Sequence, residues 1–156
     1  INKENRAIGK SEKNKLKKIL FNLYPDYIFY FSSPRIISST KRTKLLTQQY
    51  KLIYIDYLKF LIDLINKNKM KTKIFYPSSV YVKEPQKGPK GLASYIKSKY
   101  LAEKICNAKP NKKIVSFYRI PKIQSKSNYN LLGFYEGQKL SVFDKYINQF
   151  FKKHFV

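Results

Sequence analysis

Short β-prone segments alternate with longer amphipathic segments along this chain, and this alternation restricts the folds that the chain can adopt. The β-prone segments are 27–31 (YIFYF), 71–76 (KTKIFY) and 113–118 (KIVSFY). The segments with helical periodicity are 11–24, 43–67, 92–108 and 139–153. Strands separated by helices pair in parallel through right-handed crossovers. The sequence therefore predicts an α/β fold with a parallel sheet and helices on both of its faces.

Several of these elements end at residues that start or stop regular structure. Ser11 is a candidate N-cap for the first helix, and Pro25 follows the end of that helix. The continuous apolar run 27–31 is typical of a strand buried on both faces of a parallel sheet. Proline and glycine residues in 83–91 predict a loop before the third helix.

A single domain accounts for the whole chain, because 156 residues suffice for one hydrophobic core. We expect 1–10 to be irregular and 122–156 to form a C-terminal extension that ends in a basic amphipathic helix. The sequence contains no apolar run of membrane-spanning length, and its first twenty residues lack the apolar core of a signal peptide. The lone Cys106 fits a reducing compartment. These features predict a cytoplasmic protein.

The basic charge of the chain comes almost entirely from lysine. The formal net charge is +24, and only four of the 33 basic residues are arginine. A protein that reads phosphates would be expected to use more arginine, because its guanidinium group makes bidentate contacts. We therefore expect a lysine-covered surface, and binding to nucleic acid is the weaker alternative. His154, the sole histidine, is expected at this surface.

Polar residues follow each predicted strand. Ser32 and Ser33 follow the first strand, Ser78 and Ser79 the second, and Arg119 and Pro121 the third. Ligands of parallel α/β sheets bind beyond the carboxyl ends of the strands. We therefore expect the site at this edge of the sheet.

Tyr95 and Lys99 are four residues apart on the third predicted helix and share one of its faces. A lysine ammonium beside a tyrosine favours the phenolate, so Lys99 is expected to lower the pKa of Tyr95. Ser79, at the end of the preceding strand, is placed to hold a substrate oxygen. No group of residues has the spacing of a metal site.

Four segments together resemble the extended, epimerase-like branch of the short-chain dehydrogenase/reductase superfamily. They are PDYIFYFSSPR at 25–35, IFYPSSVYV at 74–82, SYIKSKYLAEKI at 94–105 and IVSFYRIP at 114–121. Their order is that of the family, and the resemblance covers about residues 20–125. It implies a Rossmann-like fold.

The resemblance also implies roles for individual residues. Tyr95 would be the acid–base group, Lys99 would hold a cofactor ribose, and Ser79 would hold the oxygen of a hydroxyl or carbonyl substrate. The cofactor would be NAD or NADP. Its other contacts would be Ser32 and Ser33 near the ribose and Ile120 and Pro121 near the nicotinamide. A homodimer through 43–67 is implied as well.

The chain departs from the family pattern at its beginning. The Gly-rich turn that holds the pyrophosphate, and the strand before it, are not found in 1–24. Asp56 lies near the position where the family often has asparagine, so a fourth catalytic residue is unsupported. We therefore expect an N-terminally incomplete domain of this type. The alternative is a catalytically silent remnant that serves as an interaction scaffold.

Overall fold

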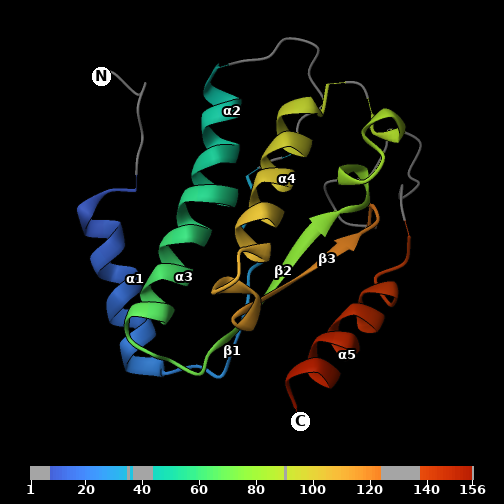
Figure 1. The fold of residues 1–156 in the computed structure, drawn as a ribbon. Helices are drawn as coiled ribbons and strands as arrows, with labels where there is room; N and C mark the ends of the chain where they lie inside the picture. The colour runs from blue at the N-terminus through green and yellow to red at the C-terminus, as the bar shows by residue number, and fades with distance from the viewer. Residues whose placement is uncertain (1–7, 35, 37–43, 90, 124–137, 156) are drawn as a thin grey trace.

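The computed structural model describes residues 8–34, 36, 44–89, 91–123 and 138–155. In these ranges the chain forms a parallel sheet flanked by helices (Figure 1). The strands are β1 (Tyr27–Phe29), β2 (Lys73–Ser79) and β3 (Val115–Ile120). β2 lies in the centre and pairs in parallel with both neighbours. The predicted α/β class, with a parallel sheet between helices, is confirmed.

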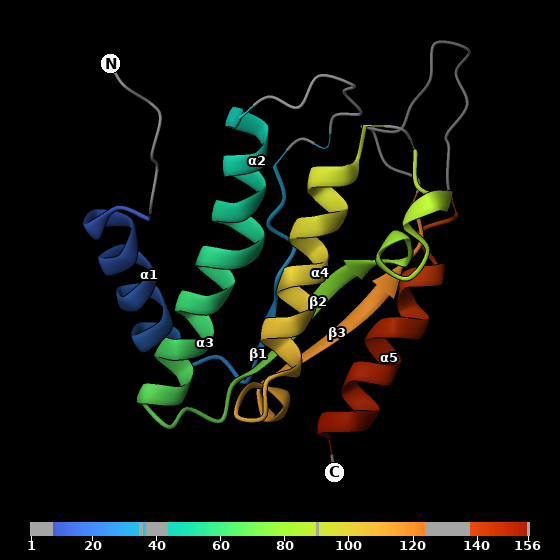
Figure 2. The ribbon, with the colours of Figure 1, turned by 45° about the horizontal axis from the view of Figure 1, so that its top comes forward.

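The helices cover the sheet unequally. They are α1 (Lys10–Leu23), α2 (Lys44–Lys51), the π-helix η1 (Leu52–Tyr57), α3 (Leu58–Lys67), α4 (Ala93–Asn107) and α5 (Val142–His154). The helices from α1 to α4 lie on one face, and α5 lies on the other (Figure 2). This follows from the strand order, because right-handed crossovers between sequential neighbours place their helices on the same face.

Alternation along β2 divides the core into two parts. Ile74 and Tyr76 face the helical layer and pack with Leu58 and Ile62 of α3. Phe75 points the other way and packs against Phe150 of α5. Because both faces of β2 are buried, residues 74–76 form a continuous apolar run in the sequence.

Two predicted boundaries are wrong. Ser11 lies inside α1, and the N-cap is Gly9, whose N–H donates to the Glu12 carboxylate at 3.0 Å. The segment 27–31 is not a strand buried on both faces, because β1 ends at Phe29 and the Phe31 side chain is 54% exposed. Among the described residues β1 pairs only with β2, so it is an edge strand and is half-buried.

The segment predicted to be helical, 43–67, is helical over 44–67, the part that the structure describes, but it is not one uniform α-helix. The π-helix η1 separates α2 from α3 and shifts the phase of the buried stripe. Residues 1–7 and 124–137 lie outside the described residues, so most of the predicted irregular segments are not tested. The basic C-terminal helix is present as α5. Within the described parts of the chain, no helix is both long and apolar enough to cross a membrane.

Candidate functional site

The carboxyl edge of the sheet brings Ser79, Tyr95 and Lys99 together. Ser79 ends β2, and α4 runs back over the strands so that its first turns lie above this edge (Figure 1). All three side chains are buried. The Ser79 hydroxyl lies close enough to Tyr95 to oppose the effect of burial on its pKa. The Lys99 amine lies 5.9 Å from the centre of the Tyr95 ring.

Lys99 is held under a layer of aromatic rings. Its Nζ donates to the Pro77 carbonyl at 2.6 Å and lies 4.0 Å from the centre of the Tyr54 ring. The Tyr76 ring is 4.7 Å away. Because the residue is only 5% exposed, burial lowers the pKa of Lys99 to about 7. The ring faces favour the charged amine, so the ammonium and the neutral amine are close in energy near neutral pH.

Burial has the opposite effect on Tyr95 and raises its pKa to about 12, against the lowering effect of the Ser79 hydroxyl. The expectation that Lys99 lowers this pKa is therefore wrong for the arrangement observed. The Lys99 amine is directed at the Pro77 carbonyl and the Tyr54 ring, and desolvation weakens its own charge. The Tyr95 hydroxyl is therefore protonated at neutral pH.

Tyr54 is a site residue that sequence reasoning missed. Its hydroxyl lies 2.6 Å from the Ser33 Oγ, and its ring contacts Tyr95 edge-on at 5.7 Å. It also stacks on Tyr50, which lies one turn earlier. Tyr54 lies in η1, and π-turns in helices often occur at functional sites. The spacing of Tyr50 and Tyr54 was visible in the sequence, but the π-turn that aims Tyr54 at Lys99 was not.

A second buried network lies beside the first. Glu103, one turn beyond Lys99 and 3% exposed, accepts a hydrogen bond from Ser78 Oγ at 2.6 Å. Arg119 donates to both oxygens of the same carboxylate, at 2.6 to 3.2 Å. The network connects β2, α4 and β3. It fixes the rotation of α4 and so keeps Tyr95 and Lys99 facing the sheet.

The predicted cofactor contacts are only partly suited to a dinucleotide. Ser32 is exposed, and Ser33 is bonded to Tyr54, so hydroxyl groups line the end of β1. Ile120 pairs in register with Ser79, and Pro121 follows it half-buried. Hydroxyl and apolar groups fit a ribose and a nicotinamide ring. The Gly-rich turn that would cradle the pyrophosphate is not in the 156 residues, so that half of a dinucleotide does not fit.

Other sequence-based candidates lie away from this edge. Asp56 is paired with Lys51 at 3.2 Å, and a fourth catalytic role for it finds no support. Cys106 is buried in the core. The residues that the structure describes include no cluster of three or more metal-ligating side chains. Comparison of the chain with models of known protein families and with curated protein sequences gave no match.

Proposed function

We propose that this chain carries the proton-transfer part of a Rossmann-like domain of the short-chain dehydrogenase/reductase type, acting on a small hydroxyl or carbonyl substrate. The observation that carries the proposal is the buried Lys99 beside the Ser79–Tyr95 pair. An apolar side chain would fill this position at lower cost, since burying an amine is unfavourable and desolvation outweighs the effect of the Glu103 charge on Lys99. Such groups with shifted pKa values concentrate at functional sites.

In the proposed reaction Tyr95 acts as the acid. The pKa of about 12 keeps its hydroxyl protonated at neutral pH, so it would donate a proton to a substrate carbonyl oxygen. Ser79 would hold the same oxygen, and Lys99 would orient Tyr95 from beneath. Ser32, Ser33, Ile120 and Pro121 would contact the ribose and nicotinamide of NAD or NADP. The nicotinamide, when bound, would supply the hydride.

The test compares two tyrosines of α4 in the intact chain. Tyr95→Phe removes only the reactive hydroxyl, and turnover of reduced nicotinamide with a carbonyl substrate should fall by roughly 10² or more. Tyr100→Phe is the matched control, because Tyr100 is exposed on the same helix. Equal turnover of Tyr95→Phe and wild type would refute the role of Tyr95.

A non-catalytic interaction scaffold is the second candidate. Two observations favour it. β1 has one partner among the described residues, which leaves a sheet edge open to pairing, and no Gly-rich turn is present. Fluorescence titration of NADH and NADPH separates the candidates, because a scaffold binds neither. The homodimer through 43–67 stays a proposal, and sedimentation velocity would test it.

A further inference from the structure

A hollow of about 320 Å³ lies at the opposite end of the sheet from the candidate site. It is bounded by the start of β3, by the end of α4 and by the last turn of α5 (Figure 2). Its lining side chains are Cys106, Asn107, Lys112, Val115, Ser116, Phe117, Tyr118 and Lys153. The resemblance implies a role for none of these residues, and the proposed reaction gives them none.

A polar cluster forms one wall of this hollow, and Ser116 lies at its centre. Ser116 is only 5% exposed, and its Oγ accepts a hydrogen bond from Lys153 Nζ at 2.9 Å. The same oxygen lies 3.0 Å from His154 Nε2. His154 is half-buried and packs on the Phe150 ring, contrary to the expectation of a surface position. The cluster therefore presents fixed hydrogen-bonding groups.

The charge of the hollow is positive and is not balanced by its lining. Lys112 and Lys153 line it, and no carboxylate does. The pKa of His154 is lowered by burial and then by the charges of Lys153 and Lys73. The C-terminal ends of α4 and α5 offset part of this charge, since a helix end carries roughly half a unit charge. The positive charge of the two lysines is larger than the negative charge of the two helix ends.

We propose that this hollow binds a small oxyanion of the phosphate class. Lys112 and Lys153 would supply the charge, and Ser116 and Tyr118 would supply hydrogen-bond donors. Phosphate groups are bound in proteins by this combination of cationic and neutral donors. The volume leaves room for the phosphate and a small attached group. The binding does not depend on the proposed reaction, because the two sites lie at opposite ends of the strands.

The imidazole of His154 provides a site-specific readout, because it is the only histidine in the chain. Proton NMR of the intact protein would follow its titration in sodium phosphate, in glycerol phosphate and in sodium chloride at equal ionic strength. A bound dianion favours the imidazolium, so both phosphates should raise the pKa of His154 with saturation. If sodium phosphate raises the pKa of His154 and glycerol phosphate does not, the ligand is free phosphate alone. An equal effect of chloride would overturn the proposal.

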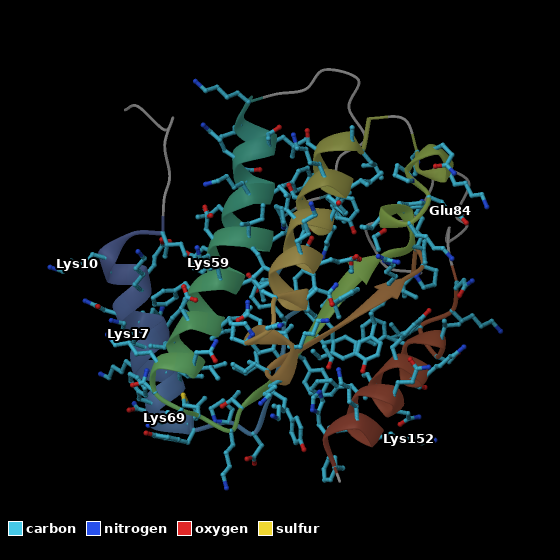
Figure 3. The ribbon with its side chains drawn as sticks, in the orientation of Figure 1. Lys10, Lys17, Lys59, Lys69, Glu84 and Lys152 are labelled. Carbon is cyan, nitrogen blue, oxygen red and sulfur yellow. The ribbon has the colours of Figure 1, made fainter. Side chains whose placement is uncertain are left out.

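Two neighbouring lysines of α5 give a matched pair of variants. Lys153→Gln should weaken phosphate binding roughly tenfold or more, the effect of losing one charge-assisted hydrogen bond. Lys152→Gln removes the same charge from an exposed position that points away from the sheet (Figure 3) and should leave the affinity unchanged. Equal weakening by both variants would show diffuse attraction to the lysine surface and would refute a built site.

Discussion

Removing Arg119 should destabilise the fold more than its position on the surface suggests. Arg119→Ala leaves the Glu103 carboxylate buried with Ser78 as its remaining described donor. Breaking a buried ion pair from one side costs about 3–5 kcal/mol. Because the Arg119 side chain is 40% exposed, water can enter the vacated space, and we expect about 3 kcal/mol. This is a large fraction of the roughly 5–15 kcal/mol that stabilises a typical domain.

Urea denaturation followed by circular dichroism measures this effect. For a slope of about 2 kcal/mol per molar urea, the midpoint should fall by about 1.5 M.

The double variant Glu103→Met, Arg119→Met is the control for this prediction. An apolar pair of similar volume often replaces a buried ion pair without loss, so the double variant should be more stable than Arg119→Ala. A midpoint shift below about 0.3 M for Arg119→Ala would refute the reasoning, since a loss of stability this small is what the removal of an exposed ion pair causes. A double variant as unstable as the single one would refute it as well.

Three further outcomes are expected for side chains on α4 or packed against it. Lys99→Met should raise the free energy of unfolding at pH 7. Because burial lowers the pKa of Lys99 from 10.5 to about 7, the lysine reduces the stability of the wild type at pH 7, and this reduction disappears as the pH rises toward 10.5. Urea melts of both proteins at pH 7 and pH 9 check this. Tyr54→Leu should lower the pKa of Lys99 further, whereas Tyr54→Phe keeps the ring and the pKa, as measured by carbon NMR of the lysine side chain. Burial raises the pKa of the Cys106 thiol to about 12, so the thiol should react with iodoacetamide only when urea unfolds the chain. Labelling of the folded protein in native buffer would contradict its buried position.

The sequence was sufficient to predict those parts of the fold in which local pattern and burial agree. The segment 74–76 is apolar because both faces of β2 are covered, and the segment 92–108 carries a clear helical stripe that becomes α4. The position of Ser79 opposite Tyr95 follows from the topology, because strands and crossover helices run in opposite directions.

The parts that could not be predicted depend on tertiary contacts. Phe31 and Phe29 are equally apolar in sequence, and only pairing with β2 decides that the strand ends between them. The π-turn of η1 has no local signature in the sequence, so Tyr54 was not expected beside Lys99. Likewise, the pKa of Tyr95 is high because the side chain is buried, and spacing along a helix does not determine this burial.

The strand order has a consequence for how the chain acquires its structure during synthesis. The strands lie side by side in the order in which they occur in the sequence, so each one pairs with a strand that has already been made. The helical layer can therefore assemble progressively from the N-terminal side. The opposite face, which carries Phe29, Phe75 and Tyr118, stays uncovered until α5 is complete. A ribosome-bound chain that ends before α5 would thus display an aromatic surface, and this surface is the part of the nascent protein that most needs a chaperone.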